Sequence, residues 1–318
     1  MGIEKYILVI LATVALRKIY NSIETDDSKN NEYKIASEFL INGDDLAKSS
    51  KPFLWIHLHY DVNARWWPSF YTRNTTCLNQ PYHYLTIKSI IDKCGEDFNI
   101  CLIDDRTFKK LIPDWQIDLS HMGDPVKSKV RELALAKILY HYGGCLLPGS
   151  FKCHKNLIDI YQSKTDGDKM FVGEFVNHAV SSDDHAVAAN TRLMGCEKGN
   201  LQMGEYATFL STLISTDYTD ESVFVGSESD WCQNKIISRE INVIPAEILG
   251  AIDTDRNIIT LDRLMGSTYI DISPCTLGIY VPEKEILSRT KYQWFARLSA
   301  QQAMEGSSML SKILVLQQ

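Results

Sequence analysis

The sequence predicts an α/β protein built on a mixed, largely parallel sheet that is flanked by helices. Short apolar runs at 53–59, 98–103 and 145–147 have the length of buried strands, and segments of helical periodicity lie between them. This alternation is typical of βαβ units, whose strands run parallel. With 318 residues, of which 45% are hydrophobic and 23% charged, the chain is long enough for one large core.

The third strand follows the clearest helical pattern, at 125–142. Asp124 is a suitable cap, Pro125 suits the first helical position, and apolar residues then recur at helical spacing. Gly143-Gly144 ends this helix, and Pro148-Gly149-Ser150 ends the strand. Because ligands of open α/β sheets bind beyond the carboxyl ends of the strands, any chemistry is expected just after this strand.

The turn into this strand has a family signature. Tyr140-His141-Tyr142-Gly143-Gly144, followed by an apolar strand, resembles the glycosyltransferases of A-type fold whose sugar-binding region contains an Asp-x-Asp motif. In that family the preceding helix also carries a Ser-Asp-x-x-Arg pattern. Counted from the two glycines, the two metal-binding aspartates of the family fall on Pro148 and Ser150. The Ser-Asp pair of the helix falls on Arg131-Glu132, and its Arg falls on Leu135. The resemblance implies a glycosyltransferase A-like, Rossmann-like sheet.

The chemistry of that motif is missing here. Two carboxylates at this strand end hold a divalent cation that bridges a nucleotide-sugar diphosphate, and such cations prefer hard oxygen ligands. Pro148 offers no ligand and Ser150 only a hydroxyl. We therefore expect no metal, no cofactor and no catalytic residue of this kind; Mn²⁺ or Mg²⁺ is expected only if the chain is an active transferase.

A second resemblance is to a branch of proteins encoded by large DNA viruses, and it covers residues 52–300. The segments that carry it are Leu54-Trp-Ile-His, Leu78-Asn-Gln-Pro-Tyr-x-Tyr-Leu-Thr-Ile-Lys-Ser-Ile-Ile, Ile103-Asp-Asp, Lys110-Leu-Ile-Pro and Tyr142-Gly-Gly-x-x-x-Pro-x-Ser-Phe. It implies that the replacement of Asp-x-Asp by Pro148-Gly149-Ser150 is a trait of the branch, and that the protein is a component of a virus particle.

The candidate residues form a vestigial nucleotide-sugar site: His57, Asp104, Asp105, Glu132, Pro148 and Ser150. His57 and His59 face the same side of the first strand and suit either a metal or, as we expect, structural hydrogen bonds. Asp104-Asp105 follows the second strand, where the family lines its nucleotide pocket. The same pair is equally suited to cap a helix at 107–111.

The second half of the chain has weaker signals. Helices are predicted at 156–163, 201–214 and 231–239, and a strand at 169–174. Asp253-Thr254-Asp255 is a literal Asp-x-Asp, but it separates two apolar runs, at 248–252 and 257–261. We interpret it as the tip of a hairpin, because two carboxylates alone are a weak metal signal.

Charge and cysteine content narrow the function further. The net charge of −7 and the absence of a basic cluster argue against a nucleic-acid partner. Eight scattered cysteines form no Cys-x-x-Cys pair, and several lie in apolar runs, so we expect reduced, buried thiols. Reduced thiols favour a domain that faces the cytosol.

The N-terminal segment, residues 1–20, is predicted to be a membrane anchor. It holds an uninterrupted apolar run at 6–16, which is shorter than a full membrane crossing. The long side chains of Lys5, Arg17 and Lys18 can reach the membrane–water interfaces and so lengthen the part of the helix that fits in the membrane. The basic residues after the run place the large domain on the cytosolic side. A signal peptide and a packing helix are the alternatives, although no small-residue cleavage site follows.

The rest of the chain is expected to comprise a polar tether at 21–51, the α/β domain at 52–300 and a helical tail at 301–318. The tail ends in an apolar stretch at 310–316, which we expect to be exposed and to dock on a partner or a membrane.

Two functions follow. The first is a membrane-anchored, glycosyltransferase-like protein that has lost metal-dependent catalysis and works through other proteins of an assembly. The alternative is an active nucleotide-sugar transferase that needs no metal or uses relocated carboxylates such as Asp104, Asp105 and Glu132.

If residues 1–20 anchor the protein, carbonate extraction should leave the full chain in the membrane fraction and release a version that lacks these residues. Release of both versions to the same extent would contradict the anchor.

Overall fold

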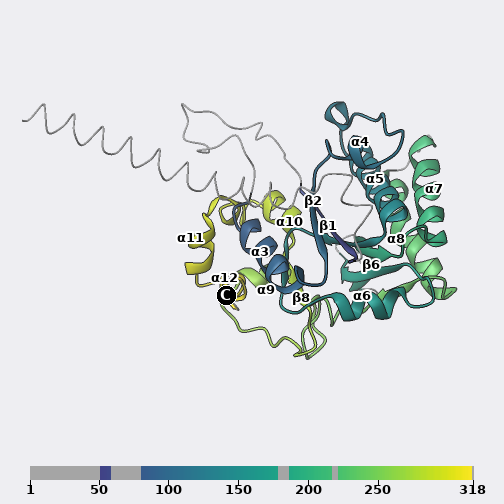
Figure 1. Cartoon of the computed structure of the whole chain (residues 1–318). Coiled ribbons are helices and arrows are strands. Elements are labelled where there is room, and N and C mark those ends of the chain that lie inside the picture. The colour runs from purple at the N-terminus through teal and green to yellow at the C-terminus, as the bar shows by residue number, and fades with distance from the viewer. Residues whose placement is uncertain (1–50, 59–79, 178–185, 217–220, 317–318) are drawn as a thin grey trace, which may run out of the picture. The chain divides into compact units, whose positions relative to one another are not determined.

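The computed structural model describes residues 51–58, 80–177, 186–216 and 221–316 (Figure 1). The chain divides into two compact units, Met1–Ile41 and Asn42–Gln318, and every described residue belongs to the second. The predicted anchor at 1–20 and residue His59 lie outside the described residues. In the described part of the chain, no helix is long and apolar enough to cross a membrane.

The centre of the second unit is a six-stranded mixed sheet in the order β2-β1-β3-β6-β5-β7. Its strands are β1 (Phe53–His57), β2 (Asn99–Ile103), β3 (Gly144–Pro148), β5 (Phe171–Val176), β6 (Val187–Cys196) and β7 (Asn242–Ile244). β1 pairs in parallel with β2 and β3, and β5 with β7, whereas β6 is antiparallel to both of its neighbours. The predicted α/β class with a mixed sheet is confirmed.

The three strands predicted in the first half of the chain lie side by side in this sheet, as expected. Leu54 pairs with Ile100 of β2 and with Cys145 of β3. Each of these strands is buried along almost its whole length. Continuous burial is what a strand covered on both faces requires, and it explains why these segments are apolar throughout rather than alternating.

The chain passes from α5 (Val126–Tyr142) into β3 through two glycines. Gly143 and Gly144 have φ angles of 70° and 101°, in the left-handed region that glycine adopts readily. A Cβ atom on Gly144 would lie 2.2 Å from the carbonyl oxygen of Phe53. In addition, Trp55 Nε1 donates a hydrogen bond of 2.9 Å to the carbonyl oxygen of Gly143. The Gly-Gly turn therefore sets β3 directly against β1.

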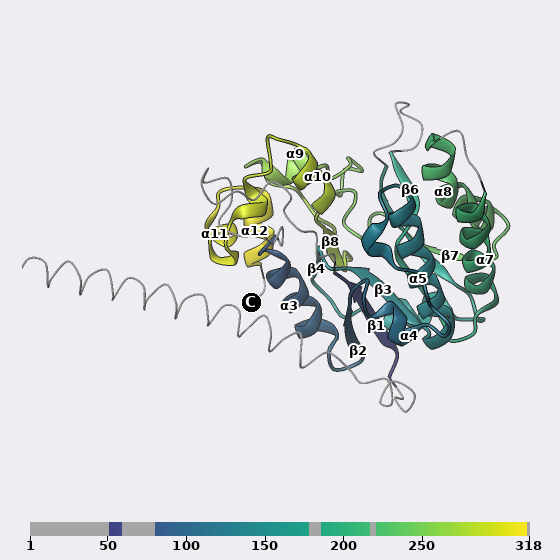
Figure 2. The same ribbon diagram turned by 90° about the horizontal axis from the view of Figure 1, so that it is seen from above.

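Helices cover both faces of the sheet, with α5 and α3 (His83–Cys94) on opposite sides (Figures 1 and 2). On the α5 side, α7 (Leu201–Ser215) packs against α5, and α8 (Glu221–Ile237) packs against β6. On the other side α3 contacts β4 (Phe151–Cys153), which forms a two-stranded antiparallel sheet with β8 (Gly278–Tyr280). The remaining elements are α4 (Phe108–Leu111), η2 (Leu119–His121), α6 (Ile158–Thr165), α9 (Leu261–Met265), α10 (Glu283–Ser288), η3 (Phe295–Arg297), α11 (Ala300–Glu305) and α12 (Met309–Val315).

The C-terminal helices complete the core rather than extend from it. Leu310, Ile313 and Leu314 of α12 are fully buried in a cluster that also contains Tyr82 and Phe295. The expectation that residues 310–316 form an exposed docking stretch is therefore wrong for these three residues. α12 is amphipathic, and its apolar face covers α9 and α11, partners that the sequence alone did not reveal.

Several element boundaries also differ from the predictions. β6 was missed because Asn190, Thr191 and Arg192 interrupt its apolar pattern. α8 begins at Glu221, well before the predicted start at Trp231. α5 begins after Pro125, and Asp124 accepts a hydrogen bond from the Ser128 hydroxyl.

Most of the described cysteines are buried, as expected. Among the described residues the following six are buried and free: Cys94, Cys101, Cys145, Cys153, Cys196 and Cys232. Cys275 is free and exposed, and Cys77 lies outside the described residues.

Replacing Leu314 by alanine should lower the free energy of unfolding by roughly 2–5 kcal/mol, because the side chain is fully buried and leaves a cavity. Leu316→Ala is the matched control: its side chain is 54% exposed, so the cost should stay below about 0.5 kcal/mol. Urea unfolding measures both values. Equal costs would contradict the burial of α12.

Candidate functional site

The carboxyl ends of β1, β2 and β3 meet at one edge of the sheet because these strands are parallel. His57 is the last residue of β1, and it pairs with Ile103 on one side and with Pro148 on the other. Asp104 and Asp105 follow β2 directly. Four of the candidate residues therefore lie at a common edge of the sheet: His57, Asp104, Asp105 and Pro148.

Asp105 is held by two basic side chains at this edge. Arg131 of α5 grips its carboxylate in a forked arrangement, with Nε 2.9 and 3.0 Å from the two oxygens and a terminal nitrogen 2.7 Å from Oδ2. His57 Nε2 lies 3.0 Å from Oδ1, and the His57 ring stacks on Phe108 at 5.3 Å between centroids. This triad joins β1, β2 and α5. Within it, His57 makes a side-chain hydrogen bond of the kind that the structural interpretation of this residue expects.

The surroundings of Asp105 keep its carboxylate ionised. Burial alone would raise its pKa, but the hydrogen bonds from His57 and Arg131, together with their charges, hold the pKa well below its usual range. A general base works best with a pKa near the working pH, so Asp105 is a poor base at neutral pH. Its negative charge is also already matched by Arg131.

Asp104 has a different role from its neighbour. Its Oδ1 accepts hydrogen bonds from the backbone amides of Arg106 and Thr107, at 3.0 and 2.9 Å, and its own amide donates to the Thr107 hydroxyl. These bonds fix the turn that leads into α4, as capping residues do. Of the pair only Asp104 makes bonds of this kind, and it fixes the turn before α4, because the N-cap residue of the helix is Thr107 and has no side-chain cap hydrogen bond.

Glu132 belongs to a second cluster, between α5, α7 and α8. One of its oxygens accepts hydrogen bonds from the hydroxyls of Thr191 and Tyr206, and the other lies 3.8 Å from Lys129 Nζ. Lys129 also forms an ion pair with Glu228 of α8. Burial and the charge of Glu132 raise the pKa of Glu228, and the same two causes raise that of Tyr206. Glu132 is thus bound into a packed network and does not join Asp105.

The Pro148-Gly149-Ser150 segment is tied into the fold through its backbone. The Gly149 carbonyl accepts a hydrogen bond of 2.6 Å from the Thr86 hydroxyl, and the Ser150 carbonyl accepts one of 3.1 Å from the amide of Val281. The Ser150 side chain is fully buried, and a hydrogen bond between its hydroxyl and Tyr280 offsets part of the rise that burial causes in the pKa of Tyr280. Neither Pro148 nor Ser150 brings a charge to this edge.

Arg192 and Tyr280 form a contact that sequence reasoning did not find. Val172 pairs with Met194 of β6 but Gly173 pairs with Asn190, so residues 191–193 bulge out of the β5–β6 ladder. The Arg192 guanidinium carbon lies 5.4 Å from the centre of the Tyr280 ring. Neither residue was a candidate, because no local sequence pattern marks Arg192 or Tyr280.

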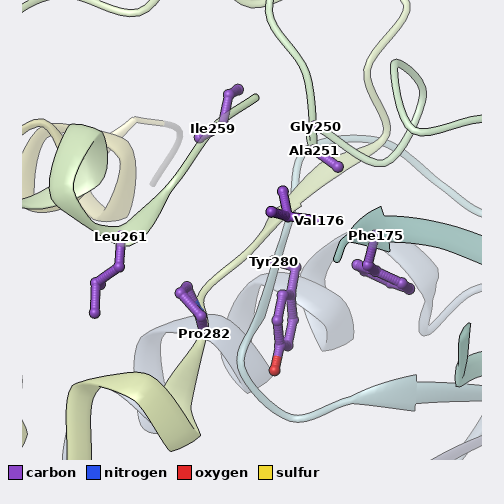
Figure 3. Close-up of a pocket in the computed structure, with 8 residues that line it drawn as sticks. All are labelled: Phe175, Val176, Gly250, Ala251, Ile259, Leu261, Tyr280 and Pro282. Carbon is purple, nitrogen blue, oxygen red and sulfur yellow. The ribbon is translucent and has the colours of Figure 1, made fainter. Parts of the chain in front are cut away.

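A small cavity opens beside Tyr280. It is lined by Phe175, Val176, Gly250, Ala251, Ile259, Leu261, Tyr280 and Pro282 (Figure 3). Its volume of about 20 Å³ holds about one water molecule, far less than a sugar needs. The aromatic rings of Phe175 and Tyr280 meet edge to face in its wall, at 5.2 Å between centroids.

The literal Asp-x-Asp at 253–255 is a turn, as predicted. Asp253 is buried, its Oδ1 accepts from the Asn257 amide at 2.8 Å, and its Oδ2 forms a 2.7 Å ion pair with Arg263. The flanking runs make a single antiparallel bridge, between Ile252 and Ile258, rather than two full strands. Within the residues that the structure describes, no three His, Cys, Asp or Glu side chains gather in a way that suits a metal ion.

The fold and this edge define an α/β protein with a mixed sheet and a strand-end site of internally paired charges. No protein-family model matches the sequence. The curated proteins contain no match either. Among solved structures the chain is similar to that of mouse xyloside xylosyltransferase 1 in its apo form, with 10% sequence identity, a TM-score of 0.40, and coverage of 73% of this chain and 98% of that one. A similarity of this degree does not identify a family.

We expect Asp105→Asn to lower the free energy of unfolding by roughly 2–4 kcal/mol at pH 7, because it leaves the Arg131 charge without its partner. The folded-state pKa of Asp105 lies below its unfolded value of about 3.9. Its contribution is therefore present above that pH and is lost as the pH falls below it, so the cost should shrink at pH 3.

Asp104→Asn serves as the matched control for this experiment. Asparagine also caps well, so the cost should be below about 1 kcal/mol. Urea unfolding of both variants at the two pH values gives the comparison. A cost for Asp105→Asn that equals that of Asp104→Asn, or that does not change with pH, would argue against the ion pair.

Proposed function

We propose that this chain is a glycosyltransferase-like protein that has lost metal-dependent catalysis and serves a structural or interaction role. The proposal rests on one observation: each carboxylate that the sequence assigned to the site already has a partner within the protein. Asp104 binds backbone amides, Asp105 pairs with Arg131, and Glu132 is held by hydroxyl groups near Lys129. A relocated catalytic acid would need a carboxyl group that can contact a substrate, whereas these three contact other groups of the protein.

The strand end itself supports the same proposal. In a metal-dependent transferase, charged oxygen ligands hold a cation that stabilises the leaving diphosphate. Pro148 and Ser150 supply neither charge nor a bidentate grip. The backbone of this segment is fixed by a hydrogen bond from Thr86 of α3 to the Gly149 carbonyl and by one from the Val281 amide to the Ser150 carbonyl. The preserved elements are those that build the scaffold, and fold alone does not carry activity with it.

The proposal has a cellular part that rests on the sequence. Residues 1–20 are proposed to anchor the protein in a membrane with the large domain on the cytosolic side. Other proteins of an assembly are the proposed partners. The resemblance to proteins of large DNA viruses suggests a virus particle as that assembly.

The test is isothermal titration with Mn²⁺ and a panel of nucleotide sugars, read beside an assay for sugar-nucleotide hydrolysis. We expect no Mn²⁺ binding in the micromolar range and no hydrolysis above the buffer rate, because the ligands that would hold the cation are absent. A metal-dependent glycosyltransferase assayed in the same buffer is the positive control.

Two outcomes would overturn the proposal. Metal-dependent turnover would restore the transferase interpretation together with a metal site. Turnover that persists in a chelator would instead indicate a metal-independent transferase. Nucleotide binding without turnover is compatible with the scaffold.

A further inference from the structure

Two cysteine side chains from different elements meet in the core. Cys94 is the last residue of α3 and Cys153 is the last residue of β4, and their sulfur atoms are 3.9 Å apart. Both residues are almost completely buried, with exposed fractions of 0% and 1%. Among the described residues no other pair of cysteines makes a sulfur–sulfur hydrogen bond. The pair is therefore a distinct feature of the contact between α3 and β4.

The backbone around this pair keeps the two sulfur atoms close. The amide of Cys153 donates a hydrogen bond of 2.9 Å to the hydroxyl of Ser89, which lies on α3 before Cys94. β4 is fixed in turn by its antiparallel pairing with β8, in which Cys153 lies opposite Gly278. Since a disulfide bond is about 2.05 Å long, the two sulfur atoms need to approach by only about 1.9 Å to form one.

The two thiols of the pair differ in acidity. A hydrogen bond from the Cys153 thiol outweighs the opposing effect of burial and lowers the pKa of Cys94. The same hydrogen bond, together with burial, raises the pKa of Cys153. Burial raises the pKa of Cys101, another core thiol, to about 12. Because the thiolate is the form that attacks an oxidant, Cys94 is the more reactive member of the pair.

The position of Cys94 at the end of a helix gives a small oxidant a route to it. Gly95 and Glu96, which follow Cys94 directly, are both exposed. Helix ends fray, and such local opening costs less free energy than global unfolding. Opening of the last turn of α3 therefore exposes the Cys94 sulfur, while β4 stays paired with β8.

We propose that Cys94 and Cys153 form a site of reversible oxidation, at which a peroxide joins α3 to β4 through a disulfide bond. The Cys94 thiolate attacks one oxygen of hydrogen peroxide, the O–O bond breaks, and the hydroxide that leaves takes up the proton lost from Cys94 to give water. The Cys153 thiol then attacks the sulfur of the resulting sulfenic acid, and its proton leaves with the hydroxyl group as a second water. The two thiols lose two electrons, and one peroxide is reduced to two waters. This site goes beyond the proposed function, because it gives the fold a second, oxidised form.

The experiment is oxidation of the reduced, purified full chain with hydrogen peroxide, followed by alkylation of the remaining thiols and mass mapping of the peptides. We expect a cross-linked pair of peptides that contain Cys94 and Cys153. We also expect the Tm to rise by roughly 4–8 °C, because the bond closes a long loop, and a dithiol reductant should reverse the rise.

Three variants assign the steps to residues. Cys153→Ser should stop the reaction at the sulfenic acid of Cys94, which dimedone traps, and should abolish the rise in Tm. Cys94→Ser should abolish both the trapped species and the cross-link. Cys275→Ser is the matched control: it removes an exposed thiol outside the pair, so the cross-link and the rise in Tm should not change. Thermal unfolding of each reduced variant shows whether it is folded.

Three results would overturn the site. They are the absence of the Cys94–Cys153 peptide pair in the oxidised full chain, an equal rise in Tm in Cys153→Ser, and loss of the cross-link in Cys275→Ser. A cross-linked protein whose Tm does not rise would reject the stabilising role of the bond. None of these results bears on the proposed scaffold role, which the titration with nucleotide sugars tests separately.

Discussion

The close approach of Gly144 to the backbone of Phe53 is the constraint on which the site depends. Any side chain at position 144 would collide with the Phe53 carbonyl, so glycine alone lets β3 pair with β1 at this point. The pairing then brings His57 opposite Pro148. The hydrogen bond from Trp55 to the Gly143 carbonyl fixes the end of α5 at the same turn. The position of this strand end therefore depends on Gly143 and Gly144, which have no side chains.

Two clusters of paired charges surround α5. α5 directs Arg131 toward β1 and β2, and it directs Lys129 and Glu132 toward α7 and α8. One helix therefore serves two separate electrostatic clusters on different sides of its axis. Each cluster uses a carboxylate that the sequence offered as a catalytic candidate. Removing one partner of a buried ion pair is costly, so both carboxylates are tied to the fold.

The sequence predicted the features that depend on a few neighbouring residues. It missed the features that depend on strand register or on contacts between residues far apart in the chain. The Gly143-Gly144 turn, the apolar strands and the turn at Asp253 have signatures within a few residues. The roles of Asp104 and Asp105 were inseparable, because the partner of Asp105 is 26 residues away on α5. Arg192 gave no signal at all, since its position depends on a bulge that appears only when β6 pairs with β5. The buried face of α12 was mistaken for an exposed one because its partners, α9 and α11, form from other parts of the chain.

The end of β3 brings no charge of its own to this edge, because Pro148 and Ser150 are neutral. The carboxylate of Asp105 at the same edge is paired with Arg131 of α5. The electrostatics of the edge are therefore set by side chains that α5 and the end of β2 supply, and not by β3 itself.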